Sequence, residues 1–210
     1  MTATETRNSG AFRLDGKFAL VTGGASGIGQ ATSRELVAAG GHVYIADLNI
    51  AGAQSLAREL GAATALQMDV TEPSSIAAAL EGIDKLDILV NNAGIGHVGD
   101  ILRTELDDLS RLLDVNVKSI FLVTRAAFPL LLASHGSIVN IGSVAGMIGI
   151  KHRLACCTSK GAVIAMTRQI AMDYPKEIRI NCICPGTVDT PFVGSYLTKG
   201  SVQSFSHFRS

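Results

Sequence analysis

The sequence predicts an α/β protein built on one doubly wound parallel sheet with helices on both faces. Two observations support this fold class. Short apolar runs alternate with amphipathic stretches from residue 17 to residue 182, and this alternation is typical of repeated strand–helix units. The runs are apolar along most of their length, as expected for strands buried on both faces. At 210 residues, of which 47% are hydrophobic and 17% charged, the chain suits one globular domain.

The expected strands are short apolar runs, and they cover 17–21, 42–46, 63–68, 86–90, 137–141 and 178–183. The expected helices lie between these runs, near 27–39, 50–60, 73–81, 105–132 and 154–174. Gly40, Gly41 and Gly61 come directly after two of the helical segments, where glycine commonly ends a helix. The elements therefore predict three layers, with the sheet between two layers of helices.

Charge and composition argue against several classes of function. The chain has 18 Lys and Arg residues against 18 Asp and Glu and no basic run, so we expect no nucleic-acid partner. The polar N-terminus lacks the apolar core of a secretory signal. The most apolar window, SIFLVTRAAFPLLLASH, is interrupted by Arg125 and Pro129, so we expect no membrane span. These features favour a cytosolic protein with reduced cysteines, whose C-C and C-x-C spacings fit no common metal site.

The segment 20–30, LVTGGASGIGQ, is the most informative part of the chain. An apolar strand leads into a turn with Gly23, Gly27 and Gly29, and a helix-like segment leaves the turn. Glycine lets the backbone approach a phosphate, and the N–H groups of the first helical turn point at it. Asp47 follows the next strand, where an acid can bond a ribose 2′-hydroxyl. The pattern predicts an NAD site; the alternative is a structural turn with a surface carboxylate.

Ligands of open parallel sheets bind beyond the carboxyl ends of the strands, so polar residues at those ends are candidate site residues. Several such residues follow the third to sixth predicted strands, and two more lie within helical segments. In chain order they are Asp69, Val70, the tetrapeptide NNAG at 91–94, Asn116, Gly142, Ser143, Lys160 and the hexapeptide PGTVDT at 185–190.

This set of motifs resembles the TGxxxGIG branch of the short-chain dehydrogenase/reductase family over about residues 14–191. The matches are TGGASGIG at 22–29, NNAG at 91–94, PGTVDT at 185–190, Asp47, Asp69, Asn116, Ser143 and Lys160. The resemblance implies a Rossmann fold and hydride transfer between NAD(H) and a small secondary alcohol or ketone. No Arg or Lys stands in the glycine turn to receive a 2′-phosphate, and Asp47 would repel one, which favours NAD over NADP.

The resemblance also implies a role for each matching residue. Gly23, Ile28 and Gly29 would hold the pyrophosphate, Asp47 the adenosine ribose, and Asp69 with Val70 the adenine. Asn91 and Gly94 would line the cofactor, and Ser26, Pro185 and Gly186 would also bind it. Lys160 would grip the nicotinamide ribose, and Val188 and Thr190 would reach the carboxamide. Ser143 would polarise the substrate carbonyl, and Asn116 would hold a proton-relay water. Three of these residues also have a structural alternative. Asn116 could satisfy a backbone group in mid-helix, Ser143 could cap a turn, and Lys160 could be a solvated surface lysine.

The chain departs from the family four residues before Lys160, where the family has a tyrosine and this chain has Cys156. Residues i and i+4 share a helix face, so Cys156 points where Lys160 points. The family's tyrosine exchanges a proton with the substrate, whereas cysteine is shorter by a whole ring and bonds hydrogen weakly. Losing a positioned acid–base group costs about 10²–10⁴ in rate, so we expect impaired activity. The alternative is a thiolate with a catalytic role of its own.

A second departure concerns the end of the chain, which closes with the serine-rich segment GSVQSFSHFRS. The family continues with a substrate-covering segment, a further helix and a seventh strand, so the last helix and strand are expected to be missing. We expect a flexible tail at 1–12, an NAD-binding domain with the catalytic site at 13–186, and a truncated substrate loop with an irregular tail at 187–210. The strand at 178–183 would then be a bare edge, and a homo-oligomer would be weakened.

The substrate is only partly indicated. Arg153 precedes the helix of Cys156, and with PGTVDTP it resembles family members that act on small hydroxy acids and sugar-derived acids. An arginine there can fork onto a carboxylate; the alternative is a solvated basic loop. Three functions stay open: a weak NAD-dependent dehydrogenase or ketoreductase acting on a small molecule, an NAD-binding protein without catalysis, and a fragment that folds poorly.

Overall fold

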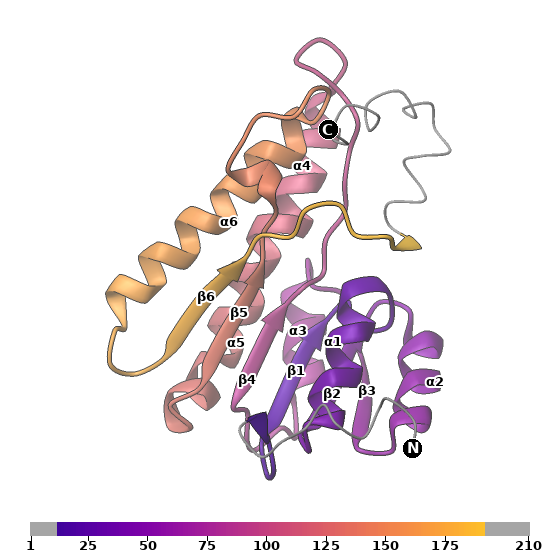
Figure 1. The fold of residues 1–210 in the computed structure, drawn as a ribbon, viewed down its shortest axis with the longest axis vertical. Helices are drawn as coiled ribbons and strands as arrows, with labels where there is room; N and C mark the ends of the chain where they lie inside the picture. Colours follow the sequence, from indigo (N-terminus) through magenta and orange to yellow (C-terminus); the bar gives the residue numbers. More distant parts are fainter. Residues whose placement is uncertain (1–11, 192–210) are drawn as a thin grey trace.

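A single parallel sheet forms the centre of the computed structural model, which describes residues 12–191. Its order is β3-β2-β1-β4-β5-β6, and every neighbouring pair is parallel (Figure 1). The strands are β1 (Phe18–Thr22), β2 (His42–Asp47), β3 (Ala63–Gln67), β4 (Ile88–Asn91), β5 (Ser137–Ile141) and β6 (Arg179–Ile183). All six predicted strands are confirmed, each within two residues of its observed bounds.

Helices connect successive strands, and the predicted helical segments are confirmed. They are α1 (Gly27–Ala38), α2 (Ile50–Leu60), α3 (Pro73–Leu80), α4 (Leu106–Leu113), α5 (Ser119–Ala133) and α6 (Leu154–Asp173). Two short elements were not predicted: a π-helical turn, η2 (Asp114–Lys118), which joins α4 to α5, and a 3₁₀ turn, η3 (Val144–Gly146). Both lie at the carboxyl end of the sheet, where the candidate site residues gather.

Two buried clusters occupy opposite faces of the sheet. Leu20 and Leu89 pack with side chains of α3, α5 and α6 on one face, and Val21 and Val90 pack with side chains of α1 and α2 on the other. Neighbouring residues of a strand point to opposite faces, so β1 and β4 contribute to both clusters. Each buried side chain of this size contributes about 1.5–3 kcal/mol. The doubly wound, three-layer fold class is therefore confirmed.

The β6 side of the sheet is less covered than its centre. β6 is the last strand of the sheet among the described residues, and Ile183 at its end is 53% exposed. The predicted bare edge is thus observed for residues 12–191. The predicted segments 1–12 and 187–210 lie mostly outside the described residues, so those boundaries stay predictions.

The strand order reverses between β1 and β4, because the chain moves outward to β2 and β3 on one side and to β5 and β6 on the other. Ligands of such sheets bind in the crevice beyond the carboxyl ends of the strands at this point. Figure 1 shows the connections that follow β4, β5 and β6 leaving the sheet at the same end as the turn between β1 and α1. The fold therefore brings the predicted site residues to one end of the sheet.

The continuous helix from α4 through α5, Leu106–Ala133, is long and apolar enough to cross a membrane by length and composition alone, despite Arg125 and Pro129. Core helices of water-soluble proteins pass the same test. Here Val123, Ala127 and Leu131 lie in the buried cluster against the sheet, so packing accounts for the apolar stripe.

Candidate functional site

The turn between β1 and α1 is closely packed, and its glycines are required by that packing. Gly23 has φ +60°, a conformation that other residues rarely adopt. A Cβ on Gly29 would lie 2.1 Å from the Gly23 carbonyl oxygen. Ser26 occupies the N-cap position of α1, but its side chain makes no capping hydrogen bond. The N–H groups at the start of α1 are therefore left without a side-chain cap, and Gly27 and Ile28 line a cavity.

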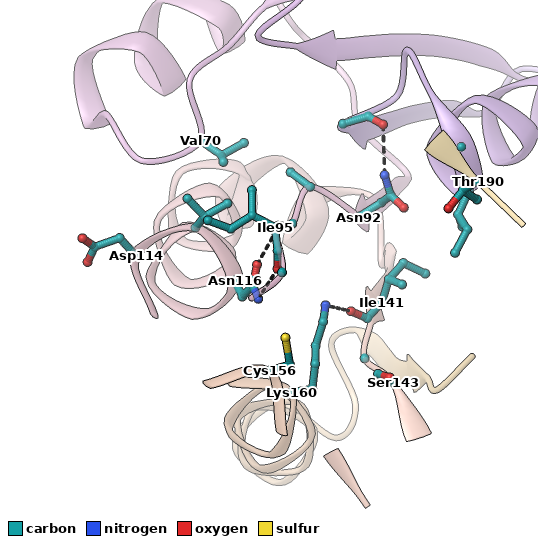
Figure 2. A pocket seen from close by; sticks show the side chains of 18 of the residues that line it. Val70, Asn92, Ile95, Asp114, Asn116, Ile141, Ser143, Cys156, Lys160 and Thr190 are labelled. Carbon is teal, nitrogen blue, oxygen red and sulfur yellow. Dashed lines mark hydrogen bonds between the residues drawn. The ribbon is translucent and has the colours of Figure 1, made fainter. Parts of the chain in front are cut away.

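Thr22 and Asn92 clamp this turn to the end of β4. The Thr22 hydroxyl accepts hydrogen bonds from the Asn92 and Ala93 N–H groups at 3.0 and 3.1 Å. The Asn92 side chain donates to the carbonyl oxygens of Thr22 and Gly23 at 2.9 and 3.0 Å. Figure 2 shows Asn92 reaching across to the turn. Sequence reasoning did not assign Thr22 or Asn92 individually, although both lie inside motifs that it identified.

Asp47 and Asp69 line the same cavity and have ordered carboxylates. Asp47 accepts hydrogen bonds from the Ala25 N–H at 3.0 Å and from the Asn49 N–H at 2.9 Å, so it also braces the glycine turn. Asp69 accepts from the hydroxyl and the N–H of Thr71 at 2.6 and 2.9 Å. These bonds lower the pKa of Asp69, because they favour the charged form.

Asn116 lies in the π-helical turn η2, and such turns are frequent at functional sites. Its side chain is 1% exposed. The amide oxygen accepts from the Ile95 N–H at 2.9 Å, and the amide nitrogen donates to the Ile95 carbonyl oxygen at 2.9 Å and to the Ser159 hydroxyl at 3.1 Å. The structural alternative, a bond to backbone, is thus present, and it fixes the asparagine at the cavity wall.

Lys160 and Ser143 lie at the opposite wall (Figure 2). The Lys160 amine donates to the Ile141 carbonyl oxygen at 2.7 Å, and burial lowers its pKa. Lys160 is therefore not a solvated surface lysine. The Ser143 hydroxyl accepts from the Ala145 N–H at 3.1 Å, which is the capping alternative, and its hydrogen remains available to a further acceptor.

The Cys156 thiol is turned toward the backbone of His97. Its sulfur accepts a hydrogen bond from the His97 N–H and donates one to the His97 carbonyl oxygen, both at 3.2 Å. Cys156 and Lys160 do share the cavity-facing side of α6, as predicted. The thiol thus ties the loop after β4 to the start of α6. None of the four cysteines forms a disulfide, and no group of potential metal ligands occurs among residues 12–191.

One cavity of about 1240 Å³ joins these features. It brings together most of the predicted residues: Gly23, Ser26, Ile28, Asp47, Asp69, Val70, Gly94, Asn116, Ser143, Arg153, Cys156, Lys160, Pro185, Gly186, Val188 and Thr190. Gly29 and Asn91 do not line it. Gly29 is packed beneath the turn, and the Asn91 amide faces the core, where it donates to Thr124 and Asn140 at 3.0 and 2.8 Å. The Asn91 side chain therefore faces away from the cavity, and the contact of this residue with the cofactor stays a prediction.

Charged residues that the sequence did not single out also border the cavity. Arg111, Asp114 and Lys118 lie on the helical segment beside Asn116, and Lys118 forms an ion pair with Asp114 at 2.6 Å. Helical spacing places them one turn apart, but only the tertiary fold shows that they reach the cavity. Arg153 also lines the cavity and donates to the His97 carbonyl oxygen at 3.4 Å.

The motifs and the geometry agree with the comparison to known proteins. A sequence model of the short chain dehydrogenase family matches residues 17–200. The chain belongs to this family. Dehydrogenase/reductase SDR family member 6 of Aquarana catesbeiana is 41% identical over 182 residues, which cover 85% of this chain and 74% of that protein. The chain is therefore one of the short-chain oxidoreductases, whose dehydrogenases act on CH–OH groups.

Two further relatives of this chain are a dehydrogenase named as inactive and a reductase solved with NADH. The inactive 2-(S)-hydroxypropyl-CoM dehydrogenase 2 of Xanthobacter autotrophicus is 42% identical over 172 residues, 79% of this chain and 75% of that protein. The solved structure of 3-ketoacyl-(acyl-carrier-protein) reductase from Brucella melitensis, complexed with NADH, has a TM-score of 0.81 at 32% identity and covers 86% of this chain and 79% of that one.

Proposed function

We propose that the cavity binds NAD(H). The observation that carries this proposal is the continuity of the cavity. One space of about 1240 Å³ is lined by the uncapped start of α1, by Asp47 and Asp69, and by Ser143 and Lys160. A helix N-terminus attracts a phosphate group through its free N–H groups and its dipole. The glycine turn leaves room for close approach there. The residues present therefore fit a dinucleotide.

The proposed contacts divide the cavity into three parts. The turn at Gly23, Ser26 and Ile28 would hold the pyrophosphate, with Gly29 packed beneath it. Asp47 would accept a hydrogen bond from the adenosine ribose, beside Asp69 and Val70. The nicotinamide half would lie near Gly94, Lys160, Pro185, Gly186, Val188 and Thr190. No Lys or Arg occurs at 23–29 to pair with a 2′-phosphate, and the Asp47 carboxylate would repel one, so we propose NAD(H) over NADP(H).

The proposed reaction is hydride transfer between NAD(H) and a small secondary alcohol or ketone. When bound, the nicotinamide supplies the hydride chemistry. The Ser143 hydroxyl would donate to the substrate oxygen, Asn116 would hold a water at the cavity wall, and Lys160 would hold the ribose hydroxyls by donated hydrogen bonds. Arg153 lines the substrate end, where a guanidinium suits the carboxylate of a hydroxy acid or sugar acid.

The Cys156 thiol limits turnover in this proposal. Its hydrogen bonds run to His97, so the thiol is not directed at a substrate oxygen. A positioned acid or base contributes about 10²–10⁴ in rate, and this chain would work without that contribution. Binding and slow hydride transfer would then remain.

A titration with NADH and NADPH tests cofactor binding. We expect NADH to bind more tightly and to raise the melting temperature, because a ligand of the native state at 100 times its Kd stabilises by about 2.7 kcal/mol. The protein without nucleotide gives the reference melting temperature, and the protein with NADPH serves as the matched control. A cooperative melt that neither nucleotide shifts would contradict the proposal.

The second candidate is an NAD-binding protein without catalysis, and the thiol contacts of Cys156 favour it. The experiment compares oxidation of small hydroxy acids by the wild type and by Cys156→Tyr, with Cys156→Phe as the control for size. Recovery of turnover by two or more orders of magnitude in the tyrosine variant alone would support a site that lacks only its proton donor. Equal turnover in all three would contradict our account of Cys156.

A cytosolic location and a homo-oligomer remain proposals. The packing of the helix Leu106–Ala133 against the sheet supports the first. Fractionation of cells and sedimentation of the purified protein would test the two points separately.

A further inference from the structure

Cys182 and Cys184 form a pair of thiols at the end of β6. Their sulfur atoms lie 3.9 Å apart, close enough for one thiol to donate a hydrogen bond to the other. Residues two apart in a strand point to the same side, so the side chains meet although Ile183 separates them in the sequence. Both cysteines are free and partly buried. Neither lines the cavity, so the proposed function gives the pair no role.

The neighbouring strand leaves space for both sulfur atoms. Gly142 directly follows β5, and a Cβ built on it would lie 2.7 Å from the Cys182 sulfur and 3.1 Å from the Cys184 sulfur. A side chain at this position would therefore displace at least one of the thiols. The Gly142 N–H donates to the Ile183 carbonyl oxygen at 2.7 Å, which fixes the backbone between the two cysteines against the end of β5. Packing thus holds the two thiols together.

The spacing of the two cysteines permits an intramolecular disulfide. An extended chain separates the Cα atoms of residues i and i+2 by about 6.4–6.8 Å, near the upper limit of about 6.8 Å for disulfides. The backbone at Ile183 must therefore bend slightly when the bond forms. Disulfides that depart from the preferred geometry are the more easily reduced ones, so we expect a bond that forms and breaks reversibly.

The other two cysteines are adjacent in the sequence but do not form such a pair. The Cys156 thiol bonds the His97 backbone, and the Cys157 thiol points to the Ile148 carbonyl oxygen, at 3.8 Å. Successive residues of a helix lie about 100° apart around its axis, so the two thiols face different directions. They provide an internal control for the pair on β6.

We propose that Cys182 and Cys184 are a redox-active dithiol that exchanges with small-molecule disulfides such as oxidised glutathione. The thiolate of one cysteine attacks a sulfur of the glutathione disulfide, so that a mixed disulfide forms and one glutathione thiolate leaves. The thiolate of the second cysteine then attacks the first cysteine's sulfur and releases the second glutathione thiolate. The two cysteines lose two electrons, the glutathione disulfide gains them, and the two thiol protons pass to the released glutathiones. This exchange does not require NAD(H).

Oxidation would reach the cavity through the segment that follows the pair, a link that rests on the proposed function. Pro185 comes directly after Cys184 and lines the cavity. Its carbonyl oxygen accepts a hydrogen bond from the Val144 N–H at 3.0 Å. Drawing Cys184 toward Cys182 shifts Pro185 and weakens this bond. NADH should therefore bind the oxidised protein about 2–10-fold more weakly than the reduced protein, as expected for the loss of one hydrogen bond.

Glutathione buffers of increasing oxidised fraction test the proposal on the purified chain. The buffers are alkaline, because burial raises the pKa of Cys182. After the remaining thiols are blocked with N-ethylmaleimide, trypsin gives the peptide 180–199, which contains the pair, and the peptide 154–160, which contains the other two cysteines. We expect the first peptide alone to lose two hydrogens and escape blocking, and dithiothreitol to reverse this change. An internal disulfide in neither peptide, or in both alike, would overturn the proposal.

Matched variants locate the bond. Cys184→Ser should lose the disulfide, whereas Cys157→Ser should oxidise as the wild type does; the opposite result would contradict the assignment. Peptide mapping of the wild type carries the test by itself if Cys184→Ser does not fold. Calorimetry with NADH then compares the reduced and oxidised wild type, and equal affinities would refute the link to the cavity. If neither form binds NADH while the pair still oxidises, the proposed cofactor is wrong and the dithiol stands.

Discussion

The substitution Gly29→Ala tests whether close packing requires glycine in this turn, because the steric cost and the gain in helix propensity have opposite effects on the stability of the protein. The added Cβ would lie 2.1 Å from the Gly23 carbonyl oxygen and 2.5 Å from the Asn92 amide nitrogen. The backbone oxygen has no freedom to rotate away, and the Asn92 amide is held by its bonds to Thr22 and Gly23. The turn or the start of α1 must therefore shift.

The expected cost follows from that overlap. Overpacking in a closely packed region costs about 1–3 kcal/mol, and the clash here is with backbone, which favours the upper end. Alanine recovers about 0.5–1 kcal/mol through its better helix propensity. The net loss should be about 2 kcal/mol. Because the shift displaces the N–H groups at Gly27 and Ile28, NADH affinity should also fall by about tenfold or more, which corresponds to 1.4 kcal/mol.

Gly161→Ala is the matched control, since Gly161 lies inside α6 and a Cβ there would meet only the Gly146 oxygen, at 3.7 Å. This substitution should stabilise by about 0.5–1 kcal/mol. Urea unfolding followed by circular dichroism measures both variants, and a calorimetric titration measures NADH binding. If Gly29→Ala were as stable as Gly161→Ala and bound NADH with the wild-type Kd, the account of the turn would be refuted.

Three further substitutions test other contacts. Burial acts to raise the pKa of Asp87, but the hydrogen bonds to its carboxylate and the charge of Lys17 outweigh burial, so the pKa is lowered overall. The lowered pKa stabilises the folded state above the ordinary pKa of about 3.9, and this stabilisation is lost as the pH falls below that value. Asp87→Asn should flatten that acid-side slope in urea unfolding measured across pH. Asp47→Asn should reduce the ratio of NADH to NADPH affinity by about tenfold or more, since a hydrogen bond to a charged group contributes about 1.5–3 kcal/mol; equal ratios in a titration would count against the ribose contact. Asn140→Ala leaves the buried Asn91 amide with one fewer acceptor and should cost about 1–3 kcal/mol in unfolding free energy.

The parts of the fold that the sequence predicted are those encoded locally. The apolar run of β1, the glycine turn and Asp47 follow one another in fixed order, and each reflects a short-range requirement for burial, close approach or an acid at a strand end. Such features depend only on the local strand and helix and not on distant segments, so the sequence pattern alone indicates them. Lys160 was identified only by its occurrence together with these motifs in the family resemblance.

The bonding partners that the sequence could not specify depend on contacts between distant segments. Asn91 and Asn92 are neighbours in one motif, yet the first bonds Asn140 in the core and the second bonds the turn at Thr22. Strand alternation places adjacent side chains on opposite sides, but the motif does not say which side meets the core. The π-helical turn at Asn116 was equally hidden, because its sequence fits an ordinary helix.

Cys156 shows how a correct local prediction can still leave the chemistry open. Helix periodicity places its side chain on the face of Lys160, and the structure agrees. The thiol, however, meets the His97 backbone, which lies 59 residues earlier in the chain. A side chain with one χ angle reaches only the nearest wall, and here that wall offers both a donor and an acceptor. The contacts that would hold a cofactor do not involve this residue. Under the proposed function, binding and turnover would therefore be separable, and a substitution at Cys156 should change turnover while leaving the turn at Gly23 and the carboxylate of Asp47 in place.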